Sequence, residues 1–389
     1  MRKTVFNVLL IACLSFSTYA SAAVTTTVTA TAGGLSAAIK KAGYATSAVT
    51  GLTINGTIDA RDFKMMRDSM ALLQNLDMTN ASIASYTGLK GPSLNTFYAT
   101  TYPANTIPEF AFAFSLVNST SLVSVKLPNT LTMIDGDGFA YCMNLTSVTL
   151  PSSLKIIGSA AFSGCSSLPS ISIPTSVDSI ADHAFMGCYM LTSLTIPSGV
   201  TTLSGWICCS CSSLSTVTLP STIKTIGDSA FYKCLSLQSI VLPTTVSSIG
   251  IRAFYNCTSL TSITAKRPVA VDLTASDSVF GKVNTKTCAL HVLSTSASSY
   301  STAKQWKDFT ISADIVGINN IQTDKLKILT ANGSVVISGL TEGISFAIYN
   351  LQGSAIYNQK ADAQTVSVNL PAKGVYVLRV GGESVKFIY

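Results

Sequence analysis

Residues 151–173 read PSSLKIIGSAAFSGCSSLPSISI, and residues 174–196 directly after them read PTSVDSIADHAFMGCYMLTSLTI. Both segments start with proline, have a hydrophobic residue at the seventh position and share an AF pair and a GC pair. The same 23-residue register holds in six consecutive units, marked by Pro128, Pro151, Pro174, Pro197, Pro220 and Pro243 and by Cys142, Cys165, Cys188, Cys211, Cys234 and Cys257. Repetition at a fixed period of this length predicts a stack of coils, a solenoid, in place of one closed globule.

A leucine-rich stretch follows each cysteine. In the unit that begins at Pro128, the residues Leu145, Val148 and Leu150 have an L-x-x-L-x-L spacing. Their alternation with small polar residues predicts a short strand whose hydroxyl residues face outward. Stacked units are expected to align these strands in one parallel sheet.

These residues resemble the BspA-like (treponemal-type) leucine-rich repeat family, in which an L-P pair is followed by an I-G pair, an A-F pair and a cysteine. The resemblance implies a mainly β (α+β) solenoid of 23-residue repeats with a parallel sheet and a cap at each end. The fourth unit departs from the pattern, because Trp206 stands where other units have alanine or similar and Cys208 where they have phenylalanine. We expect a local distortion there.

Residues 55–83 are similar to the N-terminal cap of this family. We expect a helix from about Asp59 to Leu73, followed by a strand that carries Leu76 and Met78. A cap is needed because an open solenoid end exposes apolar core and a sheet edge.

Two further segments extend the resemblance. Residues 106–114 and 121–128 together resemble one degenerate repeat, and residues 287–309 resemble the closing cap. In that cap we expect three aromatic residues to cover the last coil: Tyr300, Trp306 and Phe309.

The N-terminal residues are typical of a secretory signal. A positive start, an apolar run over residues 5–14 and a small-residue site predict cleavage between Ala22 and Ala23. Lipidation at Cys13 is a second interpretation of the same segment. No later run is long and apolar enough to predict a transmembrane helix.

From about Ile318 the 23-residue register is lost. Seven short alternating runs separated by glycine-containing turns predict a small β-sandwich. The region is similar to the C-terminal sorting domain of type IX secretion cargo, on residues Tyr349, Gly353, Gly374, Tyr376 and Lys386. That resemblance implies a Gram-negative bacterium, secretion machinery as a partner and export to the cell surface or the medium.

The predicted organisation therefore has five parts. They are a signal peptide (1–22), an N-terminal cap with the degenerate repeat (23–127), six regular repeats (128–265), a closing cap (266–317) and a sorting domain (318–389).

Charge excludes some classes of partner. The chain carries a net charge of +7, and subtracting the two positive charges of Arg2 and Lys3 leaves +5. Residues 128–265 hold four basic and five acidic side chains, so the repeats are close to neutral. Because nucleic acids and anionic membranes are bound through clustered Lys and Arg, neither is an expected partner.

Nine cysteines remain if Cys13 leaves with the signal. Coils stack at about 4.8 Å with parallel Cβ directions, whereas a disulfide needs Cβ atoms about 3.5–4.5 Å apart that point toward each other. We therefore expect a buried column of thiols that pack as small hydrophobic residues. The C-x-x-C spacing of Cys208 and Cys211 leaves a metal site, redox chemistry or a local disulfide open.

Residues suited to catalysis are sparse. The two histidines, His183 and His291, have no second histidine at ligand or triad spacing, and we expect both to be structural or surface residues. Asp135 and Asp137 resemble the start of a calcium loop, but the bidentate glutamate of such a loop is missing. No paired carboxylates, phosphate loop or nucleophile elbow is present. The sequence predicts no catalytic residue, cofactor or metal.

The outward strand positions form the candidate binding surface: Thr146, Ser147, Thr149, Ser170, Ser172, Thr192, Ser193, Thr195, Ser215, Thr216, Thr218, Gln238, Ser239, Thr261, Ser262 and Thr264. Such a surface suits many modest hydrogen bonds to an extended protein or glycan, although Ser and Thr are also common at exposed strand positions without any ligand.

A second candidate surface lies on the turns. Its aromatic residues, some of which are expected in the core, are Tyr141, Tyr189, Trp206, Tyr232 and Tyr255. We expect a non-enzymatic surface or secreted binding protein, and the family resemblance implies an adhesin for host matrix proteins, glycans or other bacteria. The alternative is a structural envelope or display protein without a specific ligand.

Overall fold

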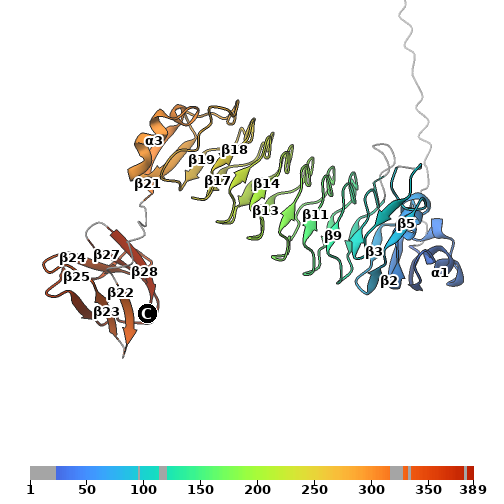
Figure 1. The fold of residues 1–389 in the computed structure, drawn as a ribbon, viewed down its shortest axis with the longest axis horizontal. Helices are drawn as coiled ribbons and strands as arrows, with labels where there is room; N and C mark the ends of the chain where they lie inside the picture. The colour runs from blue at the N-terminus through green and yellow to red at the C-terminus, as the bar shows by residue number, and fades with distance from the viewer. Residues whose placement is uncertain (1–22, 95–96, 114–120, 316–326, 332–333, 381–382) are drawn as a thin grey trace, which may run out of the picture. The chain divides into compact units, whose positions relative to one another are not determined.

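The computed structural model describes residues 23–94, 97–113, 121–315, 327–331, 334–380 and 383–389 (Figure 1). Two compact units make up the chain: residues 1–290 with 301–310, and residues 291–300 with 311–389. The predicted signal segment, including Cys13 and Ala22, lies outside the described residues.

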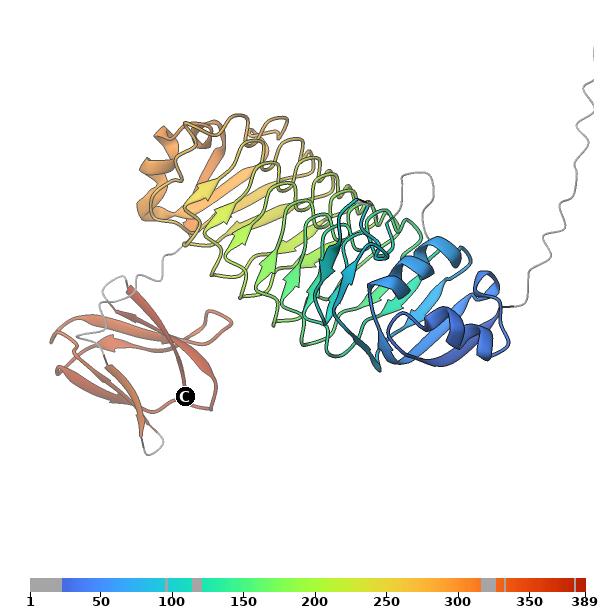
Figure 2. The same cartoon turned by 45° about the vertical axis from the view of Figure 1, so that its right-hand side comes forward.

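Short parallel strands recur along the repeats, and Figures 1 and 2 show the coils stacked in register. These strands are β8 (Ser124–Lys126), β10 (Ser147–Thr149), β13 (Ser193–Thr195), β15 (Thr216–Thr218), β17 (Ser239–Leu242) and β19 (Ser262–Ala265). Equivalent residues of neighbouring coils are paired, for example Leu194 with Val217. The prediction of a mainly β repeat solenoid is confirmed.

The sheet is not continuous, contrary to the prediction. No strand forms at residues 170–173, so β10 and β13 belong to different sheets. The break between β10 and β13 is caused by Pro169, which stands where Thr146 and Thr192 donate their N–H groups to the preceding coil. Because proline has no N–H, the corresponding bond to the coil of Thr146 cannot form. A second break separates β15 from β17, although Gln238 at the same position keeps its N–H.

A second series of two-residue strands was not predicted. Its members are β7 (Thr106–Ile107), β9 (Met133–Ile134), β11 (Ile156–Ile157), β12 (Ser179–Ile180), β14 (Thr202–Leu203), β16 (Thr225–Ile226) and β18 (Ser248–Ile249). They form two parallel sheets, in the orders β12-β11-β9-β7 and β14-β16-β18. Two residues are too few for an alternating pattern to be visible in a sequence.

The turns that carry the AF pairs are also joined from coil to coil. The N–H of Phe139 donates to the carbonyl of Ala161, and Phe162 and Phe185 repeat this bond, each at 2.9 Å. The Phe139 ring stacks on Phe162 and the Phe162 ring on Phe185, with centroids 5.4 and 5.8 Å apart. The coils are therefore linked by backbone bonds around a shared column of aromatic rings.

The fourth coil keeps this geometry, and the expected distortion was wrong. The N–H of Cys208 donates to the carbonyl of Ala230 at 2.9 Å, as the phenylalanines do in other coils. Cys208 is fully buried, and Ile207, not Trp206 as expected, takes the place of the alanine of the AF pair and is also fully buried. A larger residue beside a smaller one conserves the volume of the layer, which is the substitution that cores tolerate best.

The N-terminal region before the repeats contains strands and helices on both sides of residues 55–83. Its elements are β1 (Thr25–Ala30), α1 (Leu35–Lys41), a 3₁₀ turn (Thr46–Ala48), β2 (Gly51–Ile58), α2 (Ala60–Ser69), β3 (Asn75–Asp77), β4 (Ala81–Ile83), β5 (Tyr86–Gly88) and β6 (Thr100–Tyr102). The first sheet runs in the order β1-β2-β3-β8-β10, and β4 also pairs with β2. The cap and the first repeats therefore share one sheet.

Helix α2 is shorter than the predicted span from Asp59 to Leu73. Asp59 is its N-cap, in a capping box with Asp62. The helix ends at Ser69 because Met70 leaves helical geometry, with φ −121° and ψ 57°. Leu76 lies in β3, but Met78 lies just beyond that strand.

The degenerate repeat and the closing region complete the coils. Residues 106–107 form β7 and residues 124–126 form β8, so this segment contributes to both strand series. After the last repeat come β20 (Ala289–Leu293), a 3₁₀ turn (Ser294–Ser296), α3 (Ala297–Thr302), a second 3₁₀ turn (Trp306–Asp308) and β21 (Thr310–Ile315). The rings of Trp306 and Phe309 each lie edge-on to Phe280 at 5.0 Å, and Tyr300 is buried.

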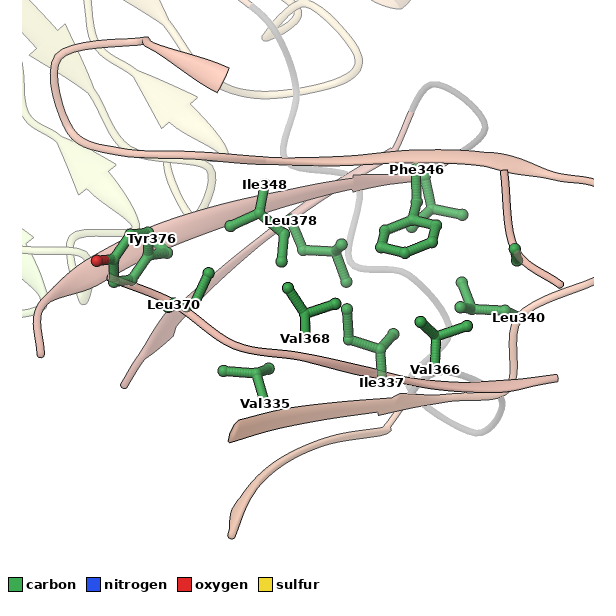
Figure 3. Packing of buried hydrophobic residues seen from close by; sticks show 12 residues of the cluster. Val335, Ile337, Leu340, Phe346, Ile348, Val366, Val368, Leu370, Tyr376 and Leu378 are labelled. Atoms are coloured by element: carbon green, nitrogen blue, oxygen red, sulfur yellow. The ribbon is translucent and has the colours of Figure 1, made fainter. Parts of the chain in front are cut away.

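Two antiparallel sheets form the C-terminal part. Their strands are β22 (Lys327–Ala331), β23 (Ser334–Ser338), β24 (Ser345–Tyr349), β25 (Ala355–Lys360), β26 (Thr365–Val368), β27 (Val375–Val380) and β28 (Glu383–Ile388), in the orders β22-β23-β26 and β25-β24-β27-β28. Figure 3 shows Ile337 and Val366 of one sheet facing Phe346 and Leu378 of the other. These strands match the seven predicted runs.

Candidate binding face

The first strand series presents a regular row of hydroxyl groups to solvent. In β13 and β15 the outer residues are exposed, whereas the central Leu194 and Val217 are buried. All of the predicted outward residues are exposed or half-buried, including Ser170 and Ser172 in the coil that lacks a strand. We call this surface the hydroxyl face and define it by the sixteen outward residues named above.

Part of the hydroxyl face is used within the solenoid. The hydroxyl groups of Thr146, Thr192, Ser215 and Thr261 donate to carbonyl oxygens of the preceding coil at 3.1–3.3 Å. Within the part of the chain that the structure describes, the other hydroxyl groups have no hydrogen-bond partner: Ser147, Thr149, Ser170, Ser172, Ser193, Thr195, Thr216, Thr218, Ser239, Ser262 and Thr264. These remain available to a ligand.

A groove of about 430 Å³ continues this surface over the cap, and sequence reasoning missed it. Its lining residues include Thr27, Thr53, Asp77 and Lys126, which are aligned across neighbouring strands. Gly51 forms part of the lining, where an added Cβ would lie 2.7 Å from a methyl group of Thr25. These residues come together because their strands pair in parallel register. No single segment of the sequence shows that pairing.

The groove contains the charged pair that the repeats lack. Lys126 Nζ lies 3.0 Å from a carboxylate oxygen of Asp77, and Ser124 donates to Asn75 at 2.7 Å. Burial opposes ionisation of Asp77, but hydrogen bonds from Thr79 and the Lys126 ammonium outweigh it and lower the pKa of Asp77. The groove is therefore polar, with an ionised carboxylate at neutral pH.

A second hollow, of about 410 Å³, lies beside the break in the sheet. It is lined by Val148, Thr149, Leu150, Ser152, Ser172 and Pro174. No backbone group of the described residues accepts a hydrogen bond from the N–H groups of residues 170–173. This part of the face thus offers main-chain as well as hydroxyl groups.

The cysteines form a buried column that also makes hydrogen bonds. The thiols of Cys165, Cys188, Cys211, Cys234 and Cys257 donate to backbone carbonyls of the preceding coil at 3.1–3.2 Å. The nine described cysteines are free thiols. A hydrogen bond with Cys211, followed by burial, raises the pKa of Cys208 well above its usual value. Such a thiol is a poor nucleophile, because the thiolate is the reactive form.

The histidines lie in different surroundings. His183 stacks on Trp206 with ring centroids 5.9 Å apart, and the Nδ1 of His291 lies 2.8 Å from a carboxylate oxygen of Asp314. Neither has a second histidine or a nucleophile among its described contacts.

The structure adds a third carboxylate to the Asp135–Asp137 turn. Burial, followed by the charges of Asp135 and Asp137, raises the pKa of Glu109. Burial also raises the pKa of Asp137. Among the described residues, no group of three or more His, Cys, Asp or Glu side chains is arranged to hold a metal ion.

The predicted aromatic residues of the turns are partly exposed. Tyr189 and Trp206 are exposed, and Tyr141, Tyr232 and Tyr255 are half-buried.

In the described part of the chain, no helix combines the length and the apolar character needed to cross a membrane.

The stacked coils and their leucine-lined parallel strands define a leucine-rich repeat solenoid protein. The chain belongs to the BspA-type leucine-rich repeat family, whose model matches residues 105–238 and 224–336 in six copies. The match covers the regular repeats and continues past the closing region.

Several solved structures are similar to this chain. A leucine-rich cell surface protein from Faecalibacterium prausnitzii is 28% identical over 52% of this chain, with a TM-score of 0.40, and the chain covers 62% of its length. A leucine-rich repeat protein from T. pallidum is 32% identical over 41% of this chain and 72% of its own, with a TM-score of 0.38. One from Bacteroides ovatus is 21% identical over 68% of this chain and 83% of its own, with a TM-score of 0.27. A search of curated proteins found no match.

Proposed function

We propose that this chain is a non-enzymatic binding protein of the cell surface or the medium, an adhesin that holds an extended protein or glycan. The observation that carries the proposal is the row of unpartnered hydroxyl groups on the hydroxyl face, which continues into the Asp77–Lys126 groove. Membership of the BspA-type family supports it.

The spacing of these groups favours an extended ligand. Parallel coils repeat the same hydroxyl position at about 4.8 Å, the spacing of neighbouring strands. Each new hydrogen bond contributes about 0.5–1.5 kcal/mol net, so affinity requires that several coils be engaged at once. Because the repeats are nearly neutral, binding should depend only weakly on salt.

The test is binding of the purified mature chain to immobilised matrix proteins, mucins and neutral glycans at two salt concentrations. The variant Thr195→Glu with Thr218→Glu places two charges on the hydroxyl face. Its matched control, Thr202→Glu with Ser248→Glu, places two charges on exposed residues of the second strand series.

Saturable binding that the first pair abolishes and the control pair retains would support the proposal. If the folded chain binds no component of the panel, the alternative of a structural envelope or display protein replaces it. Equal loss in both pairs would place the binding site away from the hydroxyl face.

Export is the second part of the proposal. The region of β22 to β28 and its turns carries the positions that resemble a type IX sorting domain, and Tyr376 donates its hydroxyl to the carbonyl of Ala372 at 2.8 Å within this region. We propose that residues 318–389 engage the secretion machinery of a Gram-negative bacterium. Deletion of these residues should leave the chain in the periplasm, and fractionation of cells that express both forms tests this.

A further inference from the structure

A row of aromatic and basic side chains crosses the turns on a surface other than the hydroxyl face. We call it the aromatic–basic row; its members are His183, Trp206, Tyr232, Tyr255, Lys233, Arg252 and Lys282. Ring centroids follow one another at 5.9 Å from His183 to Trp206, 6.0 Å from Trp206 to Tyr232 and 5.3 Å from Tyr232 to Tyr255. Each of four successive coils thus contributes one ring that is at least partly open to solvent.

Three cations lie over these rings. Lys233 Nζ is 5.4 Å from the centroid of Tyr232, and Arg252 Cζ and Lys282 Nζ are 5.9 and 5.6 Å from the centroid of Tyr255. All three side chains are exposed, and none forms an ion pair with another described residue. Three successive coils therefore each present one uncompensated positive charge, in repeats that are nearly neutral as a whole.

The backbone at these positions is in the left-handed region, which favours glycine. Lys233, Arg252 and Lys282 have φ of 60°, 55° and 65°. Gly164 and Gly187 occupy the position of Lys233 in two earlier coils. Other coils have a similar φ with non-glycine residues at these positions, such as Ser210 at 62° and Ser229 at 52°, so this backbone geometry belongs to the repeat itself.

We propose that the aromatic–basic row binds an anionic glycan that carries a carboxylate or sulfate group on successive sugars. Lys233, Arg252 and Lys282 together supply three positive charges along the row, which suits a chain with repeated negative charge. The aromatic rings stack on one another, so they add apolar surface along the row through their edges, and the cation–π contacts hold the cations beside them.

Other anionic macromolecules fit less well. Proteins that bind duplex nucleic acid commonly neutralise about 6–10 phosphates, whereas this row offers three cations. An acidic peptide that adds a strand needs free backbone groups, but the turn N–H groups of Trp206, Lys233 and Arg252 already donate to the next coil. The Lys233 bond, to the carbonyl of Tyr255, measures 2.8 Å.

The proposal is tested by titrating the mature chain with heparin, as a sulfated glycan, and with polygalacturonate, as a uronate, against dextran and single-stranded DNA. The variant is Lys233→Gln with Arg252→Gln and Lys282→Gln. The control has the same change in net charge at three exposed lysines elsewhere in the coils, Lys155→Gln with Lys224→Gln and Lys266→Gln. Unpaired surface substitutions of this kind leave folding largely unchanged, which thermal unfolding checks.

The expected result is binding to at least one of the two anionic glycans and not to dextran, weakened about tenfold or more in the variant and less than about twofold in the control. Equal weakening in both sets, absence of binding to both anionic glycans, or tighter binding to DNA would overturn the proposal. The row is separate from the hydroxyl face, so Thr195→Glu with Thr218→Glu should not change glycan binding. Failure here is thus distinguishable from failure of the proposed function.

Discussion

Thr192 donates twice to the carbonyl of Pro169, from its amide at 3.1 Å and from its hydroxyl at 3.2 Å. Thr146 forms the same pair of bonds with Val123 in an earlier coil. Pro169 has no N–H with which to donate to Thr146. Its coil is therefore hydrogen-bonded at this position to the following coil but not to the preceding one. The hollow beside Ser172 lies on the side of the preceding coil.

Replacement of Pro169 by threonine should restore the missing hydrogen bonds to the preceding coil. Pro169→Thr supplies the missing N–H and hydroxyl, and the added hydrogen bonds should raise the free energy of unfolding by about 1 kcal/mol, measured by urea titration. The control Pro220→Thr lies in a turn that needs no N–H at that position, and loss of proline rigidity should lower its stability by about 0.4–1 kcal/mol. Equal effects of the two substitutions would refute the role of the missing N–H.

In the fourth coil, substitutions of Ile207 and Cys208 should have coupled effects on the free energy of unfolding. Ile207→Ala alone leaves a cavity and should lower the free energy of unfolding by about 2–4 kcal/mol, and Cys208→Phe alone overpacks the layer at a cost of about 1–3 kcal/mol. Together they recreate the Ala–Phe pair of the other coils, so the double variant should be more stable than the sum of the two changes predicts. If thermal unfolding shows that the stability losses of the two single variants simply add in the double variant, residues 207 and 208 do not compensate each other's volume.

Asp62 joins the two helices of the N-terminal cap. Its carboxylate accepts hydrogen bonds from the N–H groups of Gly33 at 2.7 Å, Leu35 at 2.9 Å and Asp59 at 3.0 Å. Asp62→Ala leaves these donors unsatisfied near the start of α1 and should destabilise the protein by about 3 kcal/mol. Lys64→Ala on the exposed side of α2 removes only a surface ion pair and should change stability by less than about 1 kcal/mol. Circular dichroism melts of both variants measure the difference.

The raised pKa of Glu109 predicts that the stability of the protein depends on pH. This pKa is raised above the ordinary value of 4.5 by burial and then by Asp135 and Asp137. The folded chain therefore holds the proton more tightly than the unfolded chain, and this contribution to stability is full below pH 4.5 and is lost as pH rises through the folded pKa.

The variant Glu109→Gln removes that loss. It should resist urea better than the unmodified chain at pH 7, and the difference should shrink at pH 4, where the glutamate is already largely protonated. A gain that is the same at both pH values would show that ionisation of Glu109 is not the cause.

Residues with a fixed period were the most predictable. The Pro and Cys positions predicted the solenoid, and alternating residues such as Ser193, Leu194 and Thr195 indicated which side chains face solvent. The effects of single residues that depart from the repeat pattern were not predictable in the same way. Pro169 interrupts the sheet through one absent N–H, and Cys208 was expected to distort a coil that the neighbouring Ile207 keeps intact.

By itself the sequence determined the repeat, its period, the inward and outward sides of the strands, and the seven C-terminal strands, because each depends on residues close together in the chain. Only the tertiary structure decided which distant residues meet. It brought Asp77 to Lys126 in the groove, and it aligned Trp206, Tyr232 and Tyr255 in one row. The physical reason is that these contacts follow from the register between stacked strands and turns, which hydrogen bonds between coils set and which no local pattern of residues encodes.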